Sequence, residues 1–384
     1  MARVHWLGAG LSSGPGIRRL AKSGKSLVLW NRTLEKAEAA LGDLNSTAEA
    51  KRLDWDDLSS DVTSGDVVVS MLPAAMHMKV AKVCLDRGSH FVSSSYISPA
   101  MREVSAAAND QGLSFINEVG LDPGLDHLLA HELMAHYRGS DAYDPNNAHH
   151  FRSFCGGFPK VPNDFRYKFS WSPLGVLNAL RSPAKWIDEG EVCTTDSPWK
   201  SVQTYRARLP SGEEDFEAYP NRDSLPFKNE YGFGDDWDIQ TFVRGTLRLD
   251  GWSNAWKEIF DLVENADGEE GKQALVAKSE QLWNDYRYED GEADRVVLSV
   301  DMQVNNAEGE TVWHQVYCLD ECGNENGSAM ARLVSLTCSV AIESVLAGKI
   351  ESGVSAAPDD MKLVVDWLSQ MRKLGETIKR VEIV

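Results

Sequence analysis

The sequence predicts an α/β protein: a Rossmann-type doubly wound parallel sheet plus an α/β substrate domain with a mainly antiparallel sheet and a small helical insertion. Three observations lead to this prediction. An apolar segment at Val4–Leu7 runs directly into a glycine-rich turn, the usual start of a dinucleotide-binding fold. Strand-like and helix-like segments then alternate at least five times. From Phe151 onward the segments become aromatic and alternating, as antiparallel strands are.

The length of the chain is typical of two or three domains. With 384 residues, 42% of them hydrophobic, it can bury a large core. We expect residues 1–124 to form a dinucleotide-binding domain and residues 125–335 to form the second domain, with the helical insertion near 251–295. The segment 336–384 is expected to return to the first domain.

The charge, hydropathy and cysteine content of the chain limit the partners and the cellular location that we expect. Nucleic acid and anionic membranes bind basic surfaces, so a net charge of −19 argues against both as partners. The expected partner is a small-molecule substrate. No window approaches the ~18 uninterrupted apolar residues of a membrane span, and the N-terminus lacks the pattern of a signal peptide, so we expect a cytoplasmic protein. The six cysteines lack partners at zinc-ligand spacing, so we expect free thiols and no metal.

The first turn has the context of a phosphate site. Gly8-Ala9-Gly10-Leu11-Ser12-Ser13-Gly14-Pro15-Gly16 joins the first strand to an amphipathic run at Ile17–Lys22. The N-terminus of a helix placed there can hold a pyrophosphate. Ser13 stands where glycine or alanine is usual, which makes the turn a variant of the fingerprint. The alternative is a glycine-rich turn that binds nothing.

The second strand, Ser26–Trp30, ends in Asn31-Arg32-Thr33, with Thr33 as a candidate N-cap of the next helix. An acidic residue at this place holds the ribose hydroxyls in NAD-binding proteins. Here Arg32 occupies the region and suits a 2′-phosphate, so NADP(H) is the expected cofactor. The alternative is a solvated arginine at a helix start.

The remaining elements of the first domain follow the same alternation. Asp54, after the strand Lys51–Leu53, is a candidate to lie near the adenosine or an exposed loop carboxylate. Pro73 to His77 should lie along the cofactor, with His77 as a helix-start residue rather than a catalyst. The other predicted strands are Val67–Ser70, His90–Ser93 and Leu113–Ile116, and the predicted helices are Ala81–Arg87 and Ala100–Gln111.

Two polar segments follow strands of this sheet. Ser93–Pro99 carries serine and tyrosine hydroxyls, and Asn117–His127 carries a glutamate, two aspartates and a histidine before a helix that begins near Leu128. Ligands bind at the carboxyl ends of strands in open α/β sheets. Spacing alone leaves two alternatives for Asn117–His127: a ligand site, or an ordinary turn in which Asp126 caps the helix.

The second domain collects basic residues. Arg244 and Arg248 are four apart on a predicted strand, Gln240–Leu249, and therefore face the same side. Carboxylates are the natural partners of such arginines, and Lys168 and Arg222 lie in neighbouring segments. Pairing with surface acids is the alternative.

The rest of the second domain is assigned by pattern. The extended segments are Tyr167–Pro173, Ser201–Leu209, Arg295–Val304 and Val312–Leu319. Trp252–Tyr288 has helical spacing, with Ser253 as the N-cap and a break at Asp267–Gly271. A long apolar helix is expected at Gly327–Leu346.

Several long motifs, in order along nearly the whole chain, resemble the glutamate-forming saccharopine dehydrogenases, also called saccharopine reductases. These motifs are Ser94–Pro99, Asn117–His127, Cys155-Gly156-Gly157, Tyr167–Ser172, Tyr219–Asp223 and Arg244–Arg248. The resemblance implies a Rossmann domain, a substrate domain that also forms a homodimer, and a small helical domain. It implies NADP-dependent interconversion of saccharopine and water with glutamate and 2-aminoadipate 6-semialdehyde.

The resemblance also implies roles for single residues. The expected catalytic residues are Asp122, Tyr96 and Cys155. The residues expected to contact saccharopine are Ser95, Tyr96, Asp122, Arg222, Thr246, Leu247 and Arg248. The residues expected to contact the cofactor are Gly8, Gly10, Leu11, Ser12, Ser13, Asn31, Arg32, Thr33, Asp54, Leu72 and Pro73.

The chemistry of saccharopine fits these residues. Its three carboxylates need arginines in a protein that is otherwise acidic, and hydrolysis of the imine formed by hydride loss needs an acid/base group such as Asp122. The sequence departs from the family at Phe158–Arg166, a loop expected to border the substrate. Two alternatives are a dehydrogenase for another amine–semialdehyde adduct, of the carboxynorspermidine type, and a non-catalytic NADPH-binding sensor.

Overall fold

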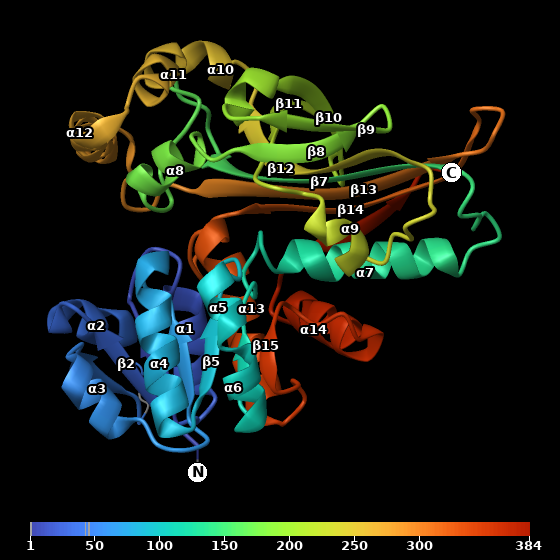
Figure 1. Ribbon diagram of the computed structural model, residues 1–384. Helices are drawn as coiled ribbons and strands as arrows, with labels where there is room; N and C mark the ends of the chain where they lie inside the picture. Colours follow the sequence, from blue (N-terminus) through green and yellow to red (C-terminus); the bar gives the residue numbers. More distant parts are fainter. Residues whose placement is uncertain (1, 43, 45–46) are drawn as a thin grey trace. The chain divides into compact units, whose positions relative to one another are not determined.

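The computed structural model describes residues 2–42, 44 and 47–384, and the chain divides into two compact units (Figure 1). Unit 1 comprises Met1–Leu128 and Glu325–Glu376, and unit 2 comprises Leu129–Asn324 and Thr377–Val384. The chain therefore returns to unit 1 at residue 325, before the expected position 336. Its last eight residues belong to unit 2, which corrects the expectation that all of 336–384 joins the first domain.

Unit 1 is built on a seven-stranded sheet with the order β15-β6-β5-β4-β1-β2-β3. Every neighbouring pair is parallel, and the order 3-2-1-4-5-6 is that of the Rossmann fold, as the sequence predicts. The strands are β1 Val4–Leu7, β2 Leu27–Asn31, β3 Glu49–Arg52, β4 Val67–Ser70, β5 His90–Ser93, β6 Ser114–Ile116 and β15 Gly353–Ser355.

Helices connect these strands. They are α1 Gly14–Lys22, α2 Leu34–Leu41, α3 Trp55–Asp61, the short 3₁₀ helix η1 Ala74–Met76, α4 His77–Arg87, α5 Pro99–Glu103, α6 Ser105–Asp110, α13 Ala329–Leu346 and α14 Met361–Lys373. The predicted helix Ala100–Gln111 is two helices, because the chain turns at Val104 between α5 and α6. By length and composition α13 could cross a membrane, but 78% of it is buried inside the protein.

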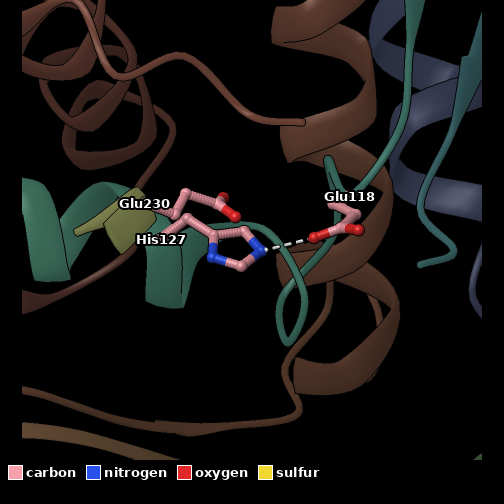
Figure 2. A group of neighbouring side chains, drawn as sticks. All are labelled: Glu118, His127 and Glu230. Atoms are coloured by element: carbon pink, nitrogen blue, oxygen red, sulfur yellow. Dashed lines mark hydrogen bonds and ion pairs between the residues drawn. The ribbon is translucent and has the colours of Figure 1, made fainter. Parts of the chain in front are cut away.

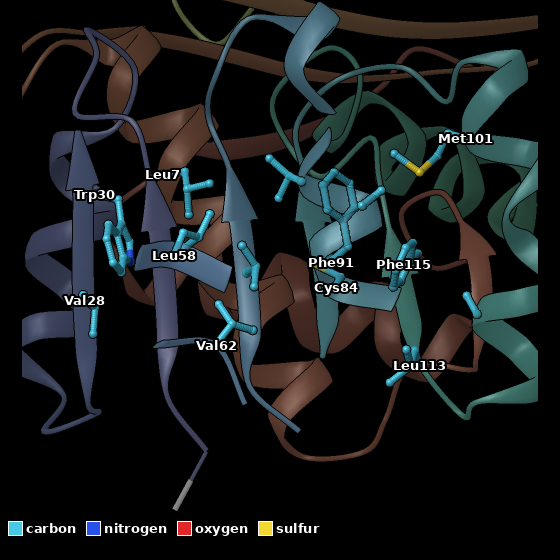
Figure 3. Packing of buried hydrophobic residues seen from close by; sticks show 14 residues of the cluster. Leu7, Val28, Trp30, Leu58, Val62, Cys84, Phe91, Met101, Leu113 and Phe115 are labelled. Carbon is cyan, nitrogen blue, oxygen red and sulfur yellow. The ribbon is translucent and has the colours of Figure 1, made fainter. Parts of the chain in front are cut away.

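One face of the sheet in unit 1 carries a continuous apolar core (Figure 3). Its strand residues run from Val28 and Trp30 on β2 to Phe115 on β6, and its helix residues include Leu58 of α3 and Cys84 of α4. Side chains buried on both faces are typical of parallel strands, and β4 is buried at all four positions. The core leaves the carboxyl ends of the strands to the loops that carry polar residues.

Two glycines let the first turn approach its neighbours. Gly8 has a φ of 103°, and a Cβ there would lie 2.9 Å from the carbonyl oxygen of Met71. A Cβ on Gly16 would collide with the backbone of Ser335 in α13, and Gly16 N donates to Ser335 Oγ at 2.8 Å. Gly16 therefore permits α1 to pack closely against α13, a helix–helix contact that differs from the helix–strand packing of the usual third fingerprint glycine.

Replacing Gly16 with alanine is expected to lower the free energy of unfolding by about 2–3 kcal/mol, since α1 and α13 must separate to admit the methyl group. Urea titration of the two proteins measures the difference. Gly10→Ala is the control, because a Cβ on Gly10 meets nothing within 4 Å. A loss for Gly16→Ala no larger than that of Gly10→Ala would contradict the packing argument.

Unit 2 contains a nine-stranded sheet. The main path is β10-β11-β12-β7-β13-β14-β16, with β8 paired to β12 and β9. All pairs are antiparallel except β12 with β7, so the predicted, mainly antiparallel sheet is confirmed. The strands are β7 Ala148–Pro159, β8 Ala184–Asp188, β9 Glu191–Thr195, β10 Gln203–Leu209, β11 Gly212–Pro220, β12 Ile239–Leu249, β13 Asp294–Asn305, β14 Thr311–Cys322 and β16 Ile378–Glu382.

The sheet of unit 2 folds over on itself. Tyr205 of β10 shares a hydrogen bond of 2.9 Å with Ser299 of β13, and Arg295 of β13 binds Glu214 of β11 through two nitrogens. An apolar core that includes Phe154, Phe216 and Leu247 fills the space between these strands. Residue pairs far apart in sequence thereby hold β10 and β11 against β13.

The helices of unit 2 pack mostly around a second apolar cluster. They are α8 Pro173–Ala179, η2 Pro198–Ser201, α9 Pro226–Glu230, α10 Trp252–Ala255, α11 Lys257–Glu264 and α12 Gly268–Tyr286, while α7 Leu125–Arg138 starts in unit 1 and continues into unit 2. Tyr167 and Phe169 lie in a loop and are buried in this cluster, so the predicted strand Tyr167–Pro173 is wrong.

The start of the helical insertion also differs from the prediction. Gly251 is the N-cap of α10, because the carboxylate of Glu217 accepts from Gly251 N at 3.1 Å and from the backbone and hydroxyl of Ser253. Ser253 is therefore not the N-cap. The break between α11 and α12 lies at residues 265–267, before the predicted Asp267–Gly271, whose last four residues belong to α12.

Candidate active site

The glycine turn lies at the carboxyl end of β1 and is held by the end of β2. Ala9 N donates to Asn31 Oδ1 at 3.2 Å, and Asn31 Nδ2 donates to the carbonyl of Thr33 at 2.8 Å. Ser13 is the N-cap residue of α1 and is buried, whereas Leu11 is 55% exposed. The turn therefore has a fixed shape at the start of a helix, which fits the pyrophosphate of a dinucleotide.

Arg32 follows β2 and is exposed, with no ion pair within the described part of the chain. Thr33 occupies the N-cap position of α2 without a side-chain hydrogen bond. An arginine at this place with an uncommitted guanidinium fits a 2′-phosphate.

Asp54 acts as the N-cap of α3, since its Oδ1 accepts from Asp56 N at 2.9 Å and from Asp57 N at 3.1 Å. Its approach to an adenosine stays a prediction. Leu72 and Pro73 follow β4 at the same edge as the glycine turn and are half-buried and exposed, respectively.

His77, at the start of α4 as predicted, joins the ends of β4 and β5. Its Nδ1 lies 2.8 Å from Ser70 Oγ, and its Nε2 lies 2.8 Å from Ser95 Oγ and 3.4 Å from Ser93 Oγ. Burial lowers the pKa of His77 to about 4, so the ring is neutral at physiological pH. A neutral ring can accept from one serine and donate to another, which holds the loop that carries Ser95.

The low pKa of His77 predicts a loss of stability in acid. The unfolded chain binds the proton first, at its ordinary pKa of 6.5, so the free energy of unfolding falls as the pH drops from 6.5 towards 4. The loss is expected to approach about 3 kcal/mol. Urea titrations between pH 7 and pH 4 should show a smaller loss of the free energy of unfolding for His77→Gln than for the wild type, because the variant lacks the His77 ring. The other histidines titrate in both proteins and do not contribute to the difference. Equal losses would contradict the assignment.

The two polar loops of unit 1 meet at their tyrosine and aspartate. Tyr96, after β5, donates its hydroxyl to Asp122 Oδ1 at 3.0 Å, and both residues are half-buried. The pair lies beyond the carboxyl ends of β5 and β6, where a parallel sheet binds ligands. A hydroxyl and a carboxylate in contact can hold and move a proton between them.

The loop from Glu118 to His127 also contains a buried pair that the sequence did not single out (Figure 2). His127 Nε2 lies 2.9 Å from Glu118 Oε2, and both side chains are buried. Asp126 lies in the first turn of α7 rather than before it, and its Oδ1 accepts from Gly124 N at 2.6 Å. The charged residues at Asn117–His127 were visible in the sequence, but their spacing does not show which of them meet.

Unit 2 brings together a second set of predicted residues. Cys155 of β7 and Thr246 of β12 are neighbours in the parallel register, and Cys155 is buried. Leu247 belongs to the apolar core, so its side chain is committed and only its backbone remains for a ligand. Arg222 is exposed and has a φ of 60°.

The two arginines of β12 are buried beside aromatic rings. Arg248 is 7% exposed and donates to the carbonyl of Leu247 and to Tyr219 Oη, at 3.1 and 2.9 Å. It has no ion pair within the described residues, and rings of Tyr167, Tyr219 and Trp252 surround it at 5.0–5.6 Å. A buried guanidinium without a carboxylate partner is suited to bind an anionic group.

Arg244 resembles Arg248, whereas Lys168 differs from it. The guanidinium of Arg244 stacks on Phe227 at 3.9 Å and is likewise buried. Lys168 forms an ion pair of 2.5 Å with Glu292, which is the alternative that the sequence left open for the basic residues.

A dinucleotide-binding unit followed by a second unit with buried arginines defines a class: oxidoreductases with a Rossmann domain and a separate substrate domain. Within this class the chain belongs to the saccharopine dehydrogenase family. Residues 4–116 match the saccharopine dehydrogenase NADP binding domain, and residues 120–376 match the saccharopine dehydrogenase C-terminal domain. The predicted family, fold class and NADP-binding domain are thereby confirmed.

Single proteins give the same result. The saccharopine dehydrogenase [NADP(+), L-glutamate-forming] of Pyricularia oryzae is 30% identical over 96% of both chains. The apo saccharopine dehydrogenase (L-Glu forming) of Saccharomyces cerevisiae has a TM-score of 0.80 and 27% identity over all of both chains. A homospermidine synthase of Legionella pneumophila has a TM-score of 0.65 at 11% identity over all of this chain and 91% of its own, which shows a shared fold only.

Proposed function

We propose that the protein is an NADP-dependent oxidoreductase that converts saccharopine and water into L-glutamate and L-2-aminoadipate 6-semialdehyde, and the reverse. The presence in one chain of both domains of the family, in order, carries the proposal. The curated relative that aligns over 96% of both chains is named for this reaction. The buried Arg248 supports it, because saccharopine has three carboxylates.

The residues of the site have separate roles in this reaction. NADP⁺ held at the glycine turn and Arg32 would supply the acceptor for the hydride that leaves the carbon beside the secondary amine. Asp122 and Tyr96 hold and move the protons that water addition to the resulting imine and departure of glutamate require. Arg248 binds a substrate carboxylate, with Arg222 and Arg244 as further cationic groups, and Ser95, Thr246 and Cys155 supply polar contacts.

The cofactor side rests on the turn and on Arg32. Gly8, Gly10, Ser12 and Ser13 present backbone at the helix start, and Arg32 binds the 2′-phosphate. We also propose that the enzyme is a cytoplasmic homodimer, with sedimentation of the purified protein as the test of the dimer.

Neither alternative from the sequence gains support. A polyamine substrate needs acidic groups, whereas Arg244 and Arg248 are buried arginines. A non-catalytic NADPH sensor has no use for a buried anion site.

The experiment is the change in absorbance at 340 nm with purified protein, saccharopine and either NADP⁺ or NAD⁺. Reduction of NADP⁺ well above that of NAD⁺ is expected. No reduction of either cofactor, with NADPH binding intact by fluorescence, would reject saccharopine as the substrate.

Arg32→Ala is expected to raise the KM for NADP⁺ by about 10-fold or more and to leave the KM for NAD⁺ unchanged, because the lost contact is with the 2′-phosphate alone. The matched control is Arg87→Ala, an exposed arginine at the end of α4. Equal changes in KM for NADP⁺ and NAD⁺ would show that Arg32 does not bind the 2′-phosphate.

A further inference from the structure

Glu118 has an unusual backbone for its residue type. Its φ is 56°, a region that glycine favours and other residues avoid. Of the four non-glycine residues with positive φ in the described chain, Glu118 is the buried one, at 3% exposure. Buried residues in such conformations persist where their surroundings hold them, and they gather at functional sites.

Glu118 holds the residues on both sides of Tyr96. Its backbone N–H donates to the carbonyl of Ser95 at 3.1 Å, and its Oε1 accepts from Ile97 N at 2.8 Å. Tyr96 therefore lies in a segment whose two neighbours are tied to one residue. Glu118 makes both of these contacts from a backbone conformation with a φ of 56°.

The second oxygen of Glu118 is held by His127. Because a carboxylate can only accept, His127 Nε2 carries the proton of the 2.9 Å hydrogen bond (Figure 2). His127 is fully buried in the first turn of α7, and its Nδ1 lies 3.9 Å from Asp126 Oδ2. The carboxylate is thus anchored to a helix rather than to a flexible loop.

The Glu118–His127 pair also joins the two ends of the segment that carries Asp122. Glu118 and His127 close a loop with Asp122 near its middle, and backbone hydrogen bonds from Gly120 to Pro123 and from Leu125 to Gly120 make the loop compact. Tyr96 and its acceptor Asp122 are therefore positioned from the same point. Loss of the Glu118 side chain would release one neighbour of Tyr96 and one end of the Asp122 loop.

We propose that Glu118, held by His127, is a positioning residue that sets the Tyr96 hydroxyl against Asp122. The inference rests on the proposed function for its kinetic test. Glu118 acts through Tyr96 and Asp122 and does not itself move the protons of the reaction.

A double-mutant cycle tests this role. Glu118→Ala is expected to lower kcat by about 100-fold, since small misplacements of reacting groups cost that much, with the KM for NADP⁺ unchanged. In a Tyr96→Phe background the same change should lower kcat by less than about 3-fold, because residues that act as a unit are not additive. Glu118→Gln keeps an oxygen for Ile97 N and should recover most of the activity.

The control is Glu376→Ala, which removes another buried carboxylate of unit 1, the partner of Arg332. It should keep its kcat per NADPH-binding site. Equal factors for Glu118→Ala in the wild-type and Tyr96→Phe backgrounds would overturn the proposal. If Glu118→Ala does not fold, Glu118→Asp takes its place in the cycle, because its shorter side chain withdraws the carboxylate from Ile97 N. Equal factors for Glu118→Asp in the two backgrounds would then overturn the proposal.

The inference can be separated from the proposed function. If the wild-type protein does not oxidise saccharopine, the function fails, and the crystal structures of wild type and the Glu118 variant decide the inference. A Tyr96 Oη–Asp122 Oδ1 distance that stays at 3.0 Å in the variant would refute it. A longer or disordered contact would support it for whichever substrate the site takes.

Discussion

Replacing Asp122 with asparagine is expected to lower kcat for saccharopine oxidation by about 100-fold to 10,000-fold, the usual size of a general acid–base contribution. In the wild-type protein the Tyr96 hydroxyl donates to Asp122 Oδ1 at 3.0 Å. Asparagine can still accept this hydrogen bond, but it cannot take up a proton. Steady-state kinetics at 340 nm measure the effect. With saccharopine deuterated at the reacting carbon, the isotope effect should fall towards one, because proton transfer becomes slower than hydride transfer.

The matched control for this variant is Asp86→Asn, which changes an exposed aspartate of α4 that pairs with Lys82. Its kcat should equal that of the wild type. NADPH affinity, measured by fluorescence, should stay the same in both variants. If Asp122→Asn keeps its turnover while Arg222→Ala raises only the KM for saccharopine, Asp122 positions the substrate and the acid/base assignment is wrong.

Replacing Arg248 with methionine is expected to raise the KM for saccharopine by about 10-fold to 100-fold, because a charge-assisted contact with a carboxylate contributes roughly 1.5–3 kcal/mol. Methionine fills much of the same space among the rings of Tyr167, Tyr219 and Trp252. Since Arg248 has no ion pair within the described chain, its removal leaves no buried carboxylate uncompensated, and the fold should tolerate the change. Initial rates over a range of saccharopine concentrations measure the effect.

Two further variants serve as controls for the Arg248→Met result. Arg206→Met removes an exposed arginine of β10 that binds Asp215, and it should leave the KM for saccharopine unchanged. Arg248→Lys keeps the charge but loses the planar pair of donors, so its KM should lie between those of wild type and Arg248→Met. An unchanged KM in Arg248→Met would show that the buried guanidinium serves packing only.

Much of the fold follows from local patterns. The β-branched run of β4, the glycine turn after β1 and the alternation along β12 each record a local hydrogen-bonding pattern and the burial of one or both faces. These features identified the parallel sheet, the mainly antiparallel sheet and the shared side of Arg244 and Arg248. The site residues came from longer motifs and from a family resemblance, because spacing alone left an ordinary turn as an alternative at Asn117–His127.

The sequence by itself determined the class of each unit, the place of the glycine turn, and the motifs that carry Tyr96 and Asp122. Only the tertiary structure decided which side chains meet: Tyr96 with Asp122, 26 residues apart, and Gly16 with Ser335, 319 residues apart. It also decided that Glu118 faces Ile97 and His127, and that β16 pairs with β14. Periodicity and turn residues encode local hydrogen bonds and burial, whereas contacts between distant residues exist only once the whole chain has packed.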